Sequence, residues 1–317
     1  MRSNLSFQLI KQSKWISLCS LLLGLTLSGN AYAQSNLKGA IDFHVHSAPD
    51  SVVRVIDADD LARHAKGMGM RGLVLKNHWE STAALTYMVR KEVPGIELFG
   101  GVTQDLAVGG INLEAVKHMF AMKGGWGRVV WLPTFDSEAQ VKYDKSNLPF
   151  VPVSKDGKLL PNVLALLDLI ATHPEAVLET GHISAEEVLM VVHEAHQRGI
   201  KHIVITHAMR PPVLMNVEQM KQAASEGAMM EFTYGAAIGA KPLVTLDHYA
   251  DAIRQVGAKY CILATDFGGG KEPTAERPLH PEGLLMFMNA MVQKGIPQSD
   301  VDMMTKTNPA IALGLQP

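Results

Sequence analysis

Two histidines near the start of the sequence, His44 and His46, have the residue type and spacing of a metal-binding pair. They lie in the segment Asp42-Phe43-His44-Val45-His46, which has the pattern of a β-strand. Side chains two residues apart in a strand point to the same face, and neutral imidazoles on one face bind a divalent cation, usually zinc. The pair alone is weak evidence, because many His-x-His pairs are polar residues on an exposed strand.

Short β-rich runs alternate with amphipathic helical stretches, and this alternation predicts the elements that must position the two histidines. The first predicted strand covers residues 40–46 and precedes a helix over 57–68. Eight βα units over about 250 residues predict an α/β protein with a (β/α)8 TIM barrel. Residues 136–161 interrupt the alternation and predict an insertion after strand four, with a small hairpin at Lys155-Asp156-Gly157-Lys158. The other seven predicted strands cover 72–76, 96–102, 128–133, 176–180, 202–206, 228–233 and 260–265.

The predicted strand ends carry a set of metal-binding side chains. In a TIM barrel the active site lies at the carboxyl ends of the strands, which converge on one mouth. Histidines with a carboxylate suit zinc, with manganese, iron or nickel as alternatives. The sequence therefore predicts a site for one or two divalent ions, with zinc preferred. Strands one, five, six and eight supply His44 and His46, then His182, His207 and Asp266.

This arrangement resembles the amidohydrolase superfamily of metal-dependent barrels, whose pattern is His-x-His on strand one, His on strands five and six, and Asp on strand eight. The resemblance spans nearly the whole chain after residue 33, including the closing Asn308-Pro309-Ala310. It implies a metal-dependent hydrolase in which Asp266 is both ligand and proton acceptor. A bound cation makes hydroxide available near neutral pH, and His207 is the candidate for polarising the substrate carbonyl. The implied metal-site residues are His44, His46, His182, His207 and Asp266.

One position departs from the pattern of two-metal members, many of which carry a bridging Lys or Glu at the end of strand four. Here that strand ends Trp131-Leu132-Pro133-Thr134. Lys76, at the end of strand two, has two open roles: a carboxylated lysine that bridges two ions, or an ammonium that binds an anionic substrate. His78 shares the parity of Lys76 and is expected in the same mouth. Arg54, after strand one, and His280, in the loop after strand eight, are further candidates for substrate contact.

The first 33 residues have the features of a secretory signal peptide. Basic residues precede an apolar run over 15–27, and Ala31-Tyr32-Ala33 supplies the small-residue cleavage pattern. The run is too short to span a bilayer, and no later segment is long and apolar enough. We therefore expect a periplasmic or secreted protein whose residues 34–317 form a single barrel domain with no membrane contact. Cys261 would be its only cysteine, which excludes an intramolecular disulfide.

The balance of charged residues limits the classes of molecule that the protein is expected to bind. The 31 acidic residues outnumber the 29 basic ones, three of which lie in the leader, and this balance argues against a nucleic-acid partner. The expected partner is a small amide, lactam, lactone or ester, and a homo-oligomer is left open. Two alternatives stand beside the hydrolase: a non-hydrolytic enzyme of the same fold, such as a decarboxylase, and a non-catalytic metal- or ligand-binding barrel.

Overall fold

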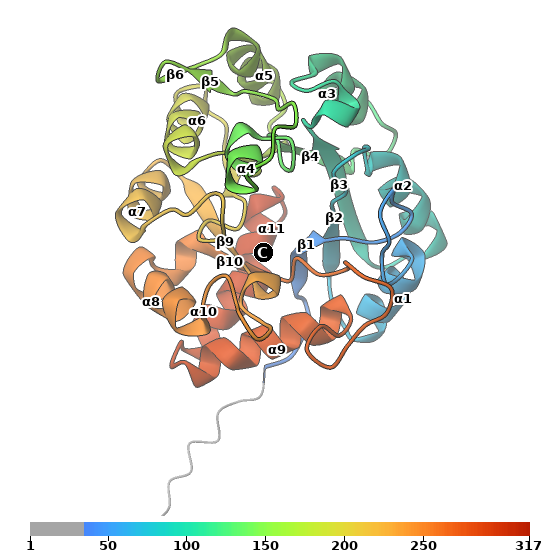
Figure 1. The fold of residues 1–317 in the computed structure, drawn as a ribbon. Coiled ribbons are helices and arrows are strands. Elements are labelled where there is room, and N and C mark those ends of the chain that lie inside the picture. Colours follow the sequence, from blue (N-terminus) through green and yellow to red (C-terminus); the bar gives the residue numbers. More distant parts are fainter. Residues whose placement is uncertain (1–34) are drawn as a thin grey trace, which may run out of the picture. The chain divides into compact units, whose positions relative to one another are not determined.

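Eight parallel strands form the centre of the structure, a computed structural model that describes residues 35–317 (Figure 1). Backbone hydrogen bonds join the last strand to the first: His46 N donates to the Phe267 carbonyl (3.1 Å), and Asp266 N donates to the His44 carbonyl (3.0 Å). The predicted (β/α)8 barrel is therefore confirmed. In order around the barrel the strands are β1 (Ile41–Val45), β2 (Gly72–Leu75), β3 (Glu97–Thr103), β4 (Gly127–Trp131), β7 (Val177–Glu179), β8 (His202–Ile205), β9 (Ala228–Thr233) and β10 (Cys261–Ala264).

The predicted signal peptide, residues 1–33, lies outside the described residues, so the cleavage expected after Ala33 stays a prediction. Over residues 35–317, no helix is both long and apolar enough to cross a membrane.

Amphipathic helices surround the strands, and several begin where the sequence offers a capping side chain. The predicted capping box of Ser184 and Glu187 is present at the start of α6. The helices are α1 (Ala58–Gly67), α2 (Ala83–Glu92), α3 (Leu113–Phe120), α4 (Glu138–Tyr143), α5 (Pro161–Ala171), α6 (Ala185–Gln197), α7 (Val217–Ser225), α8 (Leu246–Val256), α9 (His280–Gln293), α10 (Gln298–Asp302) and α11 (Asn308–Ala312). Short 3-10 turns η1 (Leu106–Val108), η2 (Tyr234–Ala236) and η3 (Ala258–Tyr260) and the π-helical turn η4 (Met303–Thr307) complete the elements.

The interruption predicted after strand four contains α4 and an antiparallel hairpin, so the small hairpin expected there is confirmed. Its strands are β5 (Ser154–Lys155) and β6 (Lys158–Leu159). The two residues between them, Asp156 and Gly157, have φ of 50° and 72°. An Asp-Gly pair tolerates this left-handed backbone well, which explains why the chain reverses here.

Alternate residues along the strands contribute to two apolar cores. Leu73 and Leu75 of β2 pack outward against the helices, whereas Val74 packs inside the barrel with residues such as Val129 and Ile262. Period-two alternation therefore decides which side chains enter the lumen. Lys76, which follows β2, continues the inward parity of Val74 and is fully buried.

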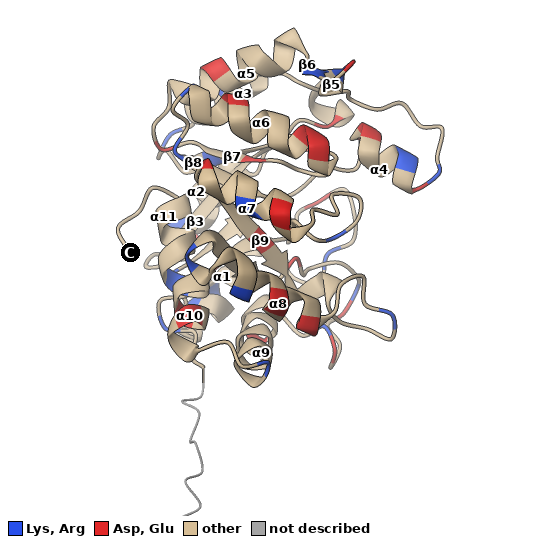
Figure 2. Cartoon of the chain, turned by 90° about the vertical axis from the view of Figure 1, so that its left-hand side faces the viewer, with Lys and Arg blue, Asp and Glu red and all other residues tan. Residues whose placement is uncertain are grey.

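The end of the barrel opposite the predicted mouth is closed by the C-terminal segment. Ala310, Ala312 and Leu313 pack into the inner apolar core, and Arg128 Nη1 donates to the Leu313 carbonyl (2.9 Å). Figure 2 shows the C terminus and α11 at one end of the molecule and α4 at the other. The same view shows acidic and basic residues interspersed along the outer helices, as expected of a solvated face. The open end of the barrel is therefore the end that carries the predicted ligands.

Candidate metal centre

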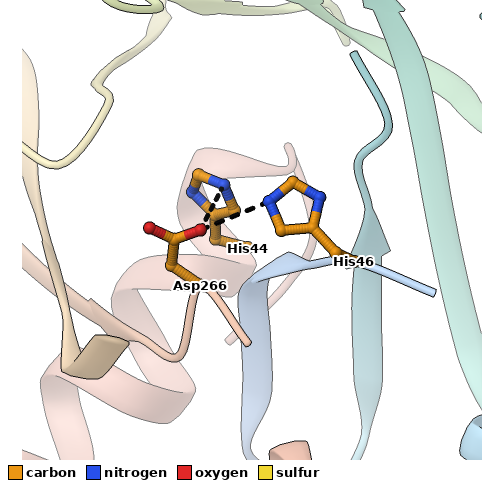
Figure 3. A group of neighbouring side chains, drawn as sticks. All are labelled: His44, His46 and Asp266. Carbon is orange, nitrogen blue, oxygen red and sulfur yellow. Dashed lines mark ion pairs between the residues drawn. The ribbon is translucent and has the colours of Figure 1, made fainter. Parts of the chain in front are cut away.

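His44, His46 and Asp266 converge at the open end of the barrel (Figure 3). Asp266 Oδ1 lies 3.4 Å from His44 Nε2 and 3.3 Å from His46 Nε2. One ligand atom from each residue fits within a 4.8 Å cluster, and both imidazoles are buried. Two imidazole nitrogens and one carboxylate oxygen form the three-ligand set of catalytic zinc sites, which leave a position for water. The donor set therefore fits a divalent cation.

Both histidines are held so that their Nε2 atoms face Asp266, and Lys76 Nζ also lies within hydrogen-bond distance of His44 Nε2. His46 Nδ1 lies 2.6 Å from the Lys76 carbonyl oxygen, to which only an N–H can donate. His44 Nδ1 donates to Glu231 Oε2 at 3.0 Å. A neutral ring that donates through Nδ1 keeps its lone pair on Nε2. This orientation of the second nitrogen is the usual support of a metal-binding histidine.

Burial also keeps these imidazoles neutral. It lowers the pKa of His44 to about 3 and that of His46 to about 4. Burial raises the pKa of Asp266, but its electrostatic interaction with the His44 imidazole, the hydrogen bond with His46 and the charge of Arg210 together hold it well below its usual value. Neutral imidazoles beside an ionised carboxylate are the protonation states that metal binding requires.

The local backbone is specialised where these side chains enter the lumen. The pairing of β1 with β2 shifts by one residue between Asp42 and Val45, a bulge that opposes Phe43 and His44 to Val74 alone. Asp266 and His207 both have positive φ, 53° and 28°. Such strain in residues other than glycine is common at functional sites, where the surrounding structure holds it.

A glycine after β10 allows the last loop to approach the site closely. Gly268 has φ of 111°, and a Cβ atom there would lie 1.9 Å from the His46 carbonyl oxygen. Any side chain at this position would push the loop away from β1. Gly268 thus lets the backbone of the last loop pass close to the backbone of His46, because glycine has no Cβ atom.

His182 and His207 face the same cavity but lie outside the cluster of three. Their ring centroids are 4.7 Å apart, and the His207 ring lies 6.0 Å from that of His44. His182 Nδ1 contacts Gln140 Oε1 (2.9 Å), and His207 Nε2 contacts Arg210 Nη1 (3.3 Å). The structure therefore brings all five predicted residues to one cavity, while the roles of His182 and His207 as ligands stay predictions.

Lys76 and His78 also reach this cavity. Lys76 Nζ lies 3.2 Å from His44 Nε2. Burial lowers the Lys76 pKa below its usual value, although the carboxyl groups of Glu179, Asp266 and Glu231 act in the opposite direction. His78 stacks on His46 at 5.0 Å and bonds through Nδ1 to Thr134 Oγ1 (2.8 Å).

The other two candidates for substrate contact, Arg54 and His280, lie in different surroundings. Arg54 lines the cavity, but its Nε donates to Asp50 Oδ2 at 2.6 Å, so its charge is paired. His280 was expected in the loop above the mouth, and the structure corrects this placement. His280 is the first residue of α9, fully buried 6.4 Å from the Phe267 ring, because the loop has already returned to the barrel wall. It does not belong to the cavity lining.

The cavity above the metal-site cluster has a volume of about 520 Å³, within the usual range for small-molecule sites. One wall is aromatic, formed by Trp79 and Phe135 with ring centroids 5.9 Å apart. Arg210 and Arg277 belong to its lining as well. A small molecule in this cavity would contact apolar, cationic and metal-binding groups together.

Comparison with known proteins places the sequence in a family. Residues 39–231 match the model of a family described as a family of unknown function, DUF6282. The chain belongs to this family. The match contains the first four predicted ligands and ends before Asp266. Among curated proteins, no sequence match to this DUF6282 chain is found.

Solved structures share the fold of this family member. One, a mutant of organophosphorus hydrolase from Deinococcus radiodurans, has 14% identity and a TM-score of 0.59, with 90% of this chain and 98% of that chain covered. A mutant of a PTE-like lactonase from Deinococcus radiodurans has 15% identity, the same coverage and a TM-score of 0.59. The predicted barrel fold is therefore shared with these solved structures.

Four charged residues of the site were missed by sequence reasoning. Glu179 and Glu231 are fully buried, and Glu231 bonds both to His44 Nδ1 and to the His207 backbone N–H (3.0 Å). The sequence did carry a sign of these two glutamates. A carboxylate at an inward position near the end of an apolar strand costs free energy to bury, so it is expected only where it has partners or a function. Arg210 and Arg277 lie in loops, where no periodicity marks their direction.

Proposed function

We propose that this protein is a metal-dependent hydrolase that uses a metal-activated water to cleave a small amide, lactam, lactone or ester. The observation that carries the proposal is the convergence of His44, His46 and Asp266, with the Nδ1 atoms of both histidines already engaged. Two proteins of similar fold, an organophosphorus hydrolase and a PTE-like lactonase, favour the same reaction class. We propose zinc as the ion and the periplasm or cell exterior as the location.

The side chains divide the chemistry among them. A divalent ion held by His44, His46 and Asp266 would supply a water of near-neutral pKa. Asp266 is ionised and can accept the proton of the attacking water and return it to the leaving group. His207, whose ring lies 6.0 Å from that of His44, is the candidate for polarising the substrate carbonyl.

Lys76 fits the role of an ammonium better than that of a bridging carboxylated lysine. Its side chain is fully buried, and the carboxylates of Glu179 and Glu231 act on it. A carboxylated lysine would add a negative charge beside two buried carboxyl groups whose pKa burial already raises, whereas an ammonium stabilises their ionised forms. We therefore propose one ion per chain.

The test is hydrolysis by zinc-loaded protein of a panel of amides, lactams, lactones and esters. We expect turnover of at least one class, and a loss of about 100-fold or more in kcat for Asp266→Asn, because the proton acceptor is removed. Asp251→Asn is the matched control, since Asp251 is an exposed residue of α8 and should keep full activity. Release of carbon dioxide from an acid panel without any hydrolysis would instead identify a decarboxylase.

A further inference from the structure

Two guanidinium groups that line the cavity have no acidic partner among residues 35–317. Arg210 contacts His207 Nε2, and Arg277 Nη2 donates to the Gly235 carbonyl at 2.9 Å. Neither forms an ion pair within that part of the chain, in contrast to Arg54, which is paired with Asp50. Arg210 and Arg277 therefore bring positive charge to the cavity that no direct ion pair within residues 35–317 neutralises, although the Arg210 charge also acts on Asp266.

The remaining carboxylates of the lining are engaged elsewhere. Asp136 Oδ2 accepts the backbone N–H of Leu106 (2.8 Å), and Asp144 accepts a bond from Gln140 Nε2 (2.9 Å). Asp266 belongs to the proposed metal centre.

The two arginines lie across the barrel from the aromatic wall. Arg210 follows β8, and Arg277 lies in the loop between β10 and α9. In the strand order, β8 is four positions from β2, which precedes Trp79, and β10 is four positions from β4, which precedes Phe135. Four positions in a barrel of eight strands correspond to opposite sides. The cavity thus has a cationic side and an apolar side, with the metal-site cluster between them.

We propose that the substrate of this site carries an anionic oxyacid group, a carboxylate or a phosphate, bound by Arg210 and Arg277. An apolar group of the same molecule packs on Trp79 and Phe135. This inference rests on the proposed hydrolase function and names its substrate class. Arginine forms strong, charge-assisted hydrogen bonds with both kinds of anion. The cavity volume of about 520 Å³ accommodates a molecule with an aromatic ring and a short charged chain.

The test measures binding to the zinc-loaded protein by calorimetry, so that it does not depend on turnover. The probes are 4-phenylbutyrate, 3-phenylpropyl phosphate and the neutral 4-phenylbutyramide. We expect at least one anion to bind about tenfold more tightly than the amide, or ~1.4 kcal/mol. The preferred anion identifies the oxyacid group. Equal binding of all three probes would overturn the proposal.

Variants distinguish anion binding by the arginines from anion binding by the metal ion, which also attracts negative charge. We expect Arg277→Gln to remove most of the preference for the anion, and Arg277 is exposed, so folding is not at risk. Arg210→Gln should act in the same direction. Arg254→Gln, an exposed residue of α8, is the matched control and should keep the full preference. An unchanged preference in both Arg277→Gln and Arg210→Gln would contradict the proposal and assign the anion to the metal.

The outcome is distinct from that of the hydrolase test. Arginine-dependent anion binding without hydrolysis of any ester or amide would overturn the proposed function and leave the ligand class standing. Hydrolysis of neutral esters as fast as of esters with a free carboxylate, unaffected by Arg277→Gln, would overturn the ligand class alone.

Discussion

The two halves of the barrel interior differ sharply in chemistry. At the end of the barrel that the C-terminal segment closes, the lumen is filled by apolar side chains such as Val129, Val204 and Ile262. Toward the mouth the same inward positions carry charged groups: Lys76 after β2, Glu179 on β7 and Glu231 on β9. The apolar half gains stability from burial, whereas the charged half pays desolvation for every group. The residues that stabilise the barrel and the residues that form the candidate site therefore occupy opposite ends of the same lumen.

The largest effect is expected where the charged half loses its cation. Lys76→Met leaves Glu179 and Glu231 buried without a positive neighbour and should lower the free energy of unfolding by about 3–5 kcal/mol at pH 8. Burial raises the pKa of both carboxyls, that of Glu231 to about 8. The folded variant therefore binds more protons than the unfolded chain, and its stability should fall as pH rises.

Urea unfolding at pH 6 and pH 8 measures this effect. The double variant Lys76→Met with Glu179→Gln removes one charge of each sign and should recover part of the loss. A Lys76→Met protein as stable as the wild type at pH 8 would show that the charged half is not held together by charge compensation.

A substitution in the apolar half should lower the stability of the protein and leave its metal affinity unchanged. Ile262→Ala empties part of the inner core, where Ile262 is fully buried, and should cost about 2–4 kcal/mol in unfolding free energy. Because Ile262 lies below the charged layer, zinc affinity per folded molecule should stay unchanged. Calorimetric zinc titration below the unfolding temperature checks this, and a large loss of affinity would break the separation of the two halves.

The smallest effect concerns His280, a buried polar group 6.4 Å from the Phe267 ring and close enough to His46 to be affected by it. Burial lowers the pKa of His280 to about 3, so between about pH 6.5 and pH 3 the unfolded chain binds a proton that the folded protein does not. Stability is therefore lost as pH falls through this range, by up to ~1.4 kcal/mol per pH unit. His280→Leu should make the unfolding free energy less steep with pH between 6 and 4.5; an identical slope would contradict the buried, neutral state.

The fold and part of the site could be predicted from the sequence because each signal was local and periodic. The alternation of strand and helix patterns predicted the barrel, and the shared mouth of parallel strands then placed His44, His46 and Asp266 together. Other groups depend on tertiary structure. Glu231 supports His44 across 187 residues of sequence, and Arg277 reaches the cavity from a long loop whose path no periodicity specifies. His280 was misplaced for the same reason.

The central claim is that His44, His46 and Asp266 hold one divalent ion. The most direct measurement is the zinc content and zinc affinity of protein stripped by a chelator and reloaded, compared with His46→Ala and with Asp251→Asn as control. We predict one ion per chain in the wild type and in the control, and an affinity at least ~10-fold weaker in His46→Ala. Two ions per chain, or an affinity that His46→Ala leaves unchanged, would contradict the account.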